Sequence, residues 1–80
     1  MPKEPIVRIT HEEIRSLFTR VDAAALDKAL TTVRSRLRFR SLDYDQAEAL
    51  RLIEELASFP GALGIVARFA KARLLLRRAS

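Results

Sequence analysis

The chain contains no cysteine and no tryptophan, and it has only two glycines, three prolines and one histidine among 80 residues. Without cysteine it forms no disulfide and no thiolate metal centre, and a single histidine provides no ligand spacing. The longest run without a charge is the 12 residues 56–67, whereas a membrane-spanning helix needs about 20 apolar residues. The sequence therefore predicts one small domain, 1–80, with no metal and no cofactor.

Signals for export or catalysis are also missing. The opening Met-Pro-Lys-Glu-Pro lacks the apolar region of a secretory signal, so we expect a cytoplasmic location. The sequence has no nucleophile elbow, phosphate loop or dinucleotide fingerprint. We therefore expect a protein that is not an enzyme.

Apolar residues make up 49% of the chain, which is too many for an intrinsically disordered protein. Their spacing predicts an all-α, compact four-helix domain. Thr10 with Glu13 forms a capping box for the first helix, Asp22 caps the second, and Ser41 or Asp43 caps the third. We expect the helices over about 11–20, 23–38, 44–58 and 62–78.

Two segments leave an alternative open. Residues 5–10 are rich in β-branched side chains, which favours a short strand or an extended arm. Residues 34–42 alternate between arginine or serine and apolar residues, which suits a strand as well as a helix end. If 5–10 and 34–42 pair as strands, the fold class becomes α+β.

The helix expected over 62–78 has two apolar stripes. One stripe holds Ile65, Phe69, Ala72 and Leu76, and the second holds Leu63, Ala67, Ala70 and Leu74. Two apolar stripes need two surfaces to bury them, of which the core of the domain supplies one. We expect the other surface to be a protein partner or a second copy of the chain. The residues predicted for this interface are Phe39, Leu63, Leu74, Leu75 and Leu76.

The net charge of +5 is unevenly distributed. Two basic segments are separated by the acidic segment 41–55. The first arginine cluster consists of Arg34, Arg36, Arg38 and Arg40, and the second basic cluster consists of Arg68, Lys71, Arg73, Arg77 and Arg78. Such a mosaic favours pairing within the chain, contact with another copy, or a footprint for an anionic partner. The arginine excess also matches coding bias in a GC-rich genome.

The string Thr32-Val33-Arg34-Ser35-Arg36-Leu37 is similar to the recognition helix in region 4 of extracytoplasmic-function sigma factors. The resemblance covers about ten residues and implies promoter binding through a helix-turn-helix. That family has a Gly-containing turn before this string, and here 26–31 contains neither Gly nor Pro. We therefore do not assign the chain to the family.

The remaining candidates have structural interpretations. Asp43, Asp45 and Glu48 resemble hard-metal ligands, but the segment continues into an apolar helix, so we interpret them as helix-capping carboxylates. His11 is expected in the first helical turn, exposed to solvent. For Phe39 we favour burial against the core over stacking on a base or filling a pocket in a partner.

The sequence thus predicts a non-enzymatic protein–protein interaction module, such as a small adaptor, regulator or chaperone-like protein. The alternative is a basic nucleic-acid-binding protein, including a transcriptional regulator, that uses the two clusters on phosphates. Binding to a membrane surface is disfavoured, because tryptophan is absent and arginines interrupt the apolar face.

Overall fold

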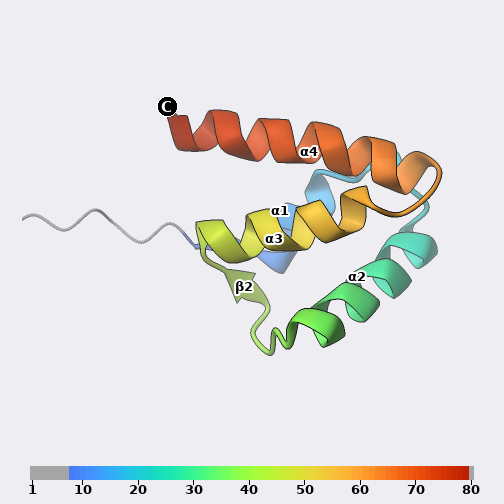
Figure 1. Ribbon diagram of the computed structural model, residues 1–80, viewed down its shortest axis with the longest axis horizontal. Coiled ribbons are helices and arrows are strands. Elements are labelled where there is room, and N and C mark those ends of the chain that lie inside the picture. Colours follow the sequence, from blue (N-terminus) through green and yellow to red (C-terminus); the bar gives the residue numbers. More distant parts are fainter. Residues whose placement is uncertain (1–7, 80) are drawn as a thin grey trace, which may run out of the picture.

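A computed structural model describes the backbone of residues 8–79 and the side chains of residues 8–76. The elements in chain order are β1 (Ile9–Thr10), α1 (His11–Ser16), α2 (Ala23–Leu37), β2 (Asp43–Tyr44), α3 (Gln46–Ala57) and α4 (Ala62–Ala79). Figure 1 shows α3 running between α2 and α4. The described part of the chain is therefore a mostly-α, four-helix domain with a two-stranded antiparallel sheet, as the apolar spacing predicts.

Polar side chains begin the first two helices as expected. The Thr10 hydroxyl accepts a hydrogen bond from the Glu13 amide at 3.1 Å, and the Glu13 carboxylate accepts one from the Thr10 amide at 3.1 Å. The Asp22 carboxylate accepts a bond from the Ala25 amide at 3.0 Å. These contacts satisfy helix amides that have no partner within their helix. Both predicted caps are confirmed.

The first helix is shorter than the expected 11–20 and ends at Ser16. Residues 17–20 form a turn in which the amides of Leu17 and Phe18 bond to carbonyls three residues back, at 3.1 and 2.9 Å. The Ser16 hydroxyl donates to the Glu13 carbonyl at 2.6 Å and so competes with the helical backbone bond at this point. The tighter turn leaves Phe18 buried in the core.

The second helix ends at Leu37, which decides between the two interpretations of 34–42. Arg38 has the left-handed φ of 61°, and its amide bonds to the carbonyls of Arg34 and Ser35. The next residue, Phe39, turns inward, and its ring centroid lies 5.8 Å from that of Tyr44. Its packing against the core is confirmed, with the ring partly buried, and 34–37 is helical rather than extended. Because α2 is continuous from Ala23, it contains no helix-turn-helix turn.

Of the strand expected over 5–10, residues 5–7 lie outside the described residues, and the described strand Ile9–Thr10 pairs with a strand that lies after 34–42. Ile9 is opposite Tyr44, and Thr10 is opposite Asp43, in antiparallel register. This strand delays the third helix, which begins at Gln46 instead of the expected 44. Its cap is Asp45, so the prediction of Ser41 or Asp43 is wrong.

Carboxylates nevertheless begin α3, as expected. The Asp45 carboxylate accepts from the Glu48 amide at 2.8 Å, and the Glu48 carboxylate accepts from the Asp45 amide at 2.9 Å. The interpretation of this acidic segment as helix-capping is confirmed for Asp45 and Glu48. Asp43 instead lies in β2 and contacts Arg8 and Ser41.

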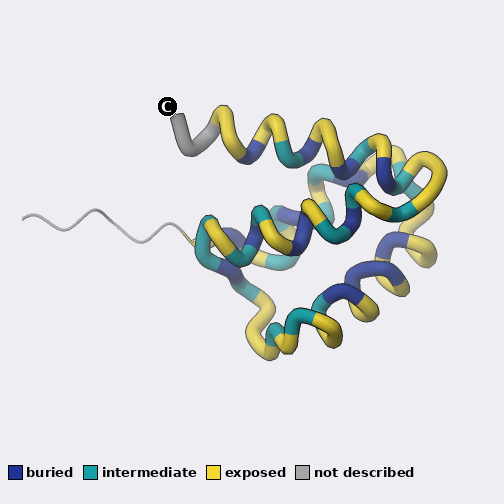
Figure 2. The backbone as a smooth tube through the Cα atoms, viewed as in Figure 1, coloured by how far each residue is buried: buried dark blue, intermediate teal, exposed yellow. Residues whose placement is uncertain are grey.

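The core is centred on α3, which packs against both α2 and α4. Four residues of α3 are inaccessible to solvent: Ala49, Leu52, Ile53 and Leu56. Leu30 and Val33 of α2 and Ile14 of α1 belong to the same buried cluster. Figure 2 shows buried backbone positions recurring along α2, α3 and α4. Because α3 lies between α2 and α4, α4 is an outer layer of the domain. One face of α4 packs on α3, and its other face is not covered by the described residues.

Candidate interaction surface

The outward face of α4 is apolar. Ile65, Phe69, Ala72 and Leu76 follow each other at steps of four, three and four residues and form what we call the outer stripe. The side chains of Ile65, Phe69 and Leu76 are 57%, 67% and 69% exposed, and Figure 2 shows the exposed positions recurring along this helix. Large apolar side chains that share one helix face and contact water make this face a candidate interaction site.

The opposite face of α4 packs on α3. Ala67, Ala70 and Leu74 are buried, and Leu63 is partly buried against the same core; these four residues form the inner stripe. Together the two stripes account for the double apolar pattern in the sequence. The core covers one of them, and nothing in the described part of the chain covers the other.

This arrangement changes the membership of the predicted interface. Leu74 and Leu63 belong to the inner stripe, and Phe39 packs against Tyr44 and the core, so these three side chains serve the domain itself. Leu75, 42% exposed, and Leu76 remain on the surface. The interface set predicted from the sequence omits Ile65 and Phe69, although the sequence places them on one apolar stripe. Sequence periodicity does not say which of the two apolar stripes faces the core.

The first arginine cluster is partly engaged within the chain. The Arg34 guanidinium donates to the Ser41 carbonyl at 2.8 Å, and Arg36 forms an ion pair with Glu55 at 3.0 Å. Arg38 closes α2, and Arg38 and Arg40 are exposed.

The second basic cluster lies on α4. Lys71 pairs with Glu54 at 2.9 Å. Arg68 and Arg73 are exposed and form no ion pair with the described residues. The side chains of Arg77 and Arg78 lie outside the described part of the chain.

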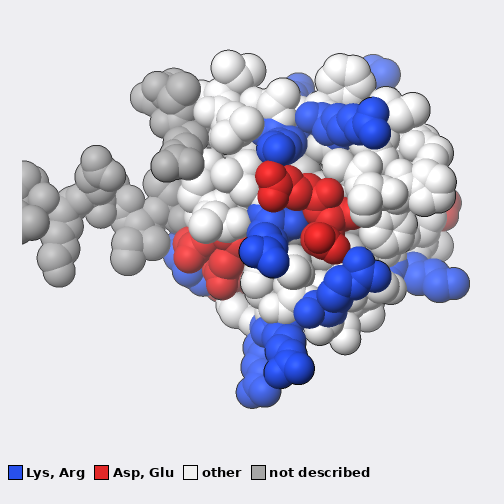
Figure 3. Space-filling model, viewed as in Figure 1, with Lys and Arg blue, Asp and Glu red and all other residues white. Residues whose placement is uncertain are grey.

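Acidic side chains of α3 connect the two clusters. Glu54 forms an ion pair with Lys71 of the second basic cluster, and the neighbouring Glu55 forms one with Arg36 of the first arginine cluster. Figure 3 shows acidic groups between basic ones on this face. Pairing within the chain therefore explains part of the charge mosaic, and the two clusters do not form a continuous basic surface here.

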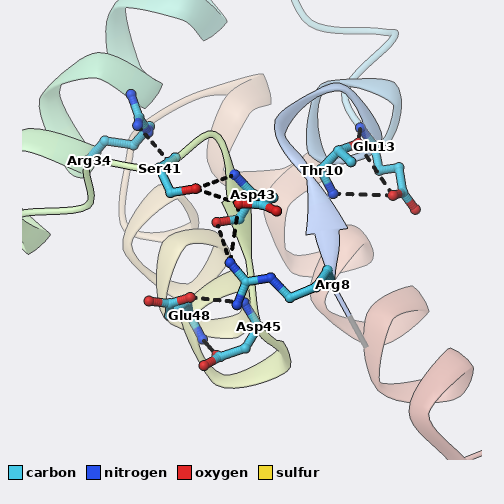
Figure 4. A network of polar contacts seen from close by, with 8 residues as sticks. All are labelled: Arg8, Thr10, Glu13, Arg34, Ser41, Asp43, Asp45 and Glu48. Atoms are coloured by element: carbon cyan, nitrogen blue, oxygen red, sulfur yellow. Dashed lines mark hydrogen bonds and ion pairs between the residues drawn. The ribbon is translucent and has the colours of Figure 1, made fainter. Parts of the chain in front are cut away.

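A polar network links the small sheet to α2 through Ser41, whose carbonyl accepts a hydrogen bond from Arg34 (Figure 4). Arg8 donates to the Asp43 carboxylate at 3.1 Å, and Ser41 donates to the same carboxylate. These hydrogen bonds, from Ser41 first and then Arg8, lower the pKa of Asp43 below its usual value. The network is at the surface, and its contacts position the segment between α2 and α3.

His11 is half-buried and hydrogen-bonded, which corrects the expectation of a solvent-exposed side chain. Its Nδ1 lies 2.9 Å from the hydroxyl of the buried Tyr44. Burial lowers the pKa of His11, and the positive charges of Arg34 and Arg15 lower it further, against smaller effects of Glu12 and Asp27 in the opposite direction. Sequence reasoning missed this pair because 33 residues separate its members. Only the pairing of β1 with β2 brings them together.

We expect the free energy of unfolding to fall as the pH drops below about 6.5, the ordinary pKa of histidine. The folded state lowers the pKa of His11, so the unfolded state binds the proton more readily and is favoured on acidification. Urea denaturation at pH 7.5 and at about pH 5 measures the effect. A His11→Gln variant should lose this part of the pH dependence, and an equal dependence in both proteins contradicts the assignment.

Comparison with protein-family models, with curated proteins and with solved structures gave no match. Within residues 8–76 no group of three or more His, Asp or Glu side chains is arranged to hold a metal ion. Among the described helices none combines the length and the apolar character needed to cross a membrane. The outer stripe is therefore the feature from which we argue a function.

Proposed function

We propose that this chain is a non-enzymatic interaction module that docks a protein on the outer stripe of α4. The observation that supports the proposal is the exposure of Ile65, Phe69 and Leu76 on one face of a helix whose other face is buried. Burying a fully exposed large apolar side chain contributes about 1.5–3 kcal/mol. Ile65, Phe69 and Leu76 are each more than half exposed, so covering all three contributes more than half of that amount per side chain.

The chemistry of this face favours binding over catalysis. An aliphatic and aromatic helix face contributes contact area, but it contains no acid, base or nucleophile among its four members. Large aromatic side chains such as Phe69 are the type of residue that anchors an interface when it enters a pocket of the partner.

The nucleic-acid alternative has less support. Arg34, Arg36 and Lys71 already contact oxygen atoms of the chain itself. A phosphate backbone would have to compete with the carboxylates of Glu54 and Glu55, which lie between the two clusters and repel it. Arg38, Arg40, Arg68 and Arg73 remain exposed, but no described contact orders them into a groove-binding element.

Site-directed photo-crosslinking in the native cells tests the proposal. A photoreactive phenylalanine analogue replaces Phe69 in one protein and the exposed Thr31 of α2 in a control protein. We expect discrete protein adducts from position 69, identified by mass spectrometry, that disappear when Ile65→Glu and Leu76→Glu are added. Because all these positions are exposed, folding should be retained, and circular dichroism checks this.

Two results distinguish success from failure. An adduct that depends on the outer stripe supports the module, whether the captured protein is a different chain or a second copy. The proposal is wrong if position 69 yields no more adduct than position 31, or if the adducts persist when the stripe carries glutamates.

A further inference from the structure

The outer stripe has the spacing of a coiled-coil seam. Steps of four, three and four residues place Ile65 and Ala72 at d positions and Phe69 and Leu76 at a positions of a heptad. A single row of this kind, repeated at every turn, fits the side chains of one facing helix. Binding to a membrane surface would instead require a broad apolar face on the helix.

Arginines flank this seam on both sides. In the same heptad Arg68 takes a g position and Arg73 an e position, and the other two flanking residues are Leu75 at g and Val66 at e. Both arginines are exposed and without an ion pair in the described part of the chain. Charges at e and g select the partner of a coiled coil by interhelical ion pairs. The seam therefore offers positive charge at its edges and no negative charge.

This charge pattern opposes pairing with a second copy. In a parallel pair a g position faces the e position of the next heptad, which sets Arg68 of one copy against Arg73 of the other. In an antiparallel pair g faces g and e faces e, so each arginine meets either an arginine or an apolar residue. Neither orientation gives an ion pair.

We infer that the outer stripe binds an acidic amphipathic helix of another protein, with apolar residues at its a and d positions and Glu or Asp at its e and g positions. The inference rests on the proposed function and specifies its partner. Ile65, Phe69 and Leu76 supply the apolar contact. Arg68 and Arg73 each bind a carboxylate of the partner.

Two synthetic helical peptides of about three heptads test the inference. Both carry leucine at a and d, with glutamate at every e and g position in the acidic peptide and lysine in the basic peptide. Fluorescence anisotropy with labelled peptide measures binding at low and at high salt. Each of the two arginines attracts the acidic peptide and repels the basic one, so the acidic peptide should bind about tenfold more tightly.

Charge reversal on the chain provides the matched control. The double variant Arg68→Glu, Arg73→Glu should prefer the basic peptide, whereas Arg51→Glu, at an exposed position of α3, should keep the wild-type preference. Phe69→Glu should abolish binding of both peptides. Higher salt should reduce the difference between the peptides, because exposed ion pairs are screened.

The inference is overturned if the two peptides bind equally, or if reversing both arginines leaves the preference unchanged. It is also overturned if light scattering shows a dimer that Phe69→Glu dissociates, or if phosphatidylglycerol vesicles bind the chain and neither peptide does. If the chain forms such a dimer, photo-crosslinking at position 69 still captures a protein. The interaction module is then supported, and the inference of an acidic partner is wrong. If position 69 gives no crosslinks and neither peptide binds, the interaction module and its acidic partner are both wrong.

Discussion

Replacing Gly64 by alanine is expected to lower the free energy of unfolding by about 3 kcal/mol or more. A Cβ atom at this position would lie 2.0 Å from the carbonyl oxygen of Phe59 and 3.1 Å from that of Ala57. Both are backbone atoms at the end of α3 and in the turn that follows it, so a rotamer change cannot relieve the overlap. The start of α4 would have to move away from α3.

Helix propensity predicts the opposite sign for this substitution. Alanine is favoured over glycine within a helix by about 1 kcal/mol, and Gly64 lies in the first turn of α4. The close approach outweighs propensity, because the contact between α3 and α4 is a main part of the core. Because the single core of a domain of about this size rarely supplies more than about 3–5 kcal/mol, the variant should be largely unfolded.

The neighbouring glycine provides the control. Gly61 has a φ of 76°, and a Cβ built there meets no atom within 4 Å. Gly61→Ala should cost only the strain of the left-handed conformation, about 1–2 kcal/mol. Urea denaturation followed by circular dichroism ranks the two variants. If Gly64→Ala is as stable as wild type, α3 and α4 do not meet as described.

Leu74→Ala is expected to lower the free energy of unfolding by about 2–5 kcal/mol, whereas Leu76→Ala should change it by no more than about 0.5 kcal/mol. The two leucines belong to opposite stripes of one helix. Leu74 is 1% exposed and Leu76 is 69% exposed. Truncation at Leu74 leaves a cavity against α3, while truncation at Leu76 removes atoms that already contact water.

Measurement of both variants by urea denaturation decides which stripe of α4 faces the core. Because helix propensity and side-chain chemistry are the same in the two substitutions, their difference reports tertiary packing alone. Equal losses would indicate that α4 is covered on both faces in solution, for example by a second copy. In that case the loss at Leu76 should grow with protein concentration, because association stabilises the folded form by mass action.

The capping residues show how far sequence reasoning extends. The sequence predicts Thr10 with Glu13, and Asp22, as caps, and both act as caps, because a cap depends on residues that are near neighbours in the chain. For the third helix the sequence predicts Ser41 or Asp43, whereas the cap is Asp45. Asp43 and Tyr44 form a strand that pairs with Ile9 and Thr10, so the helix starts after them. No local pattern in the sequence predicts that pairing.

The sequence by itself determined that the chain is mostly helical, where each long helix lies to within about two residues, and that the last helix has two apolar stripes. These properties depend on spacing and on contacts between near neighbours. Tertiary structure alone decided which stripe is buried, that His11 meets Tyr44, and that Glu54 and Glu55 engage both basic clusters. The physical reason is that periodicity describes a helix in isolation, whereas the side of α4 that faces water is set by the position of α3.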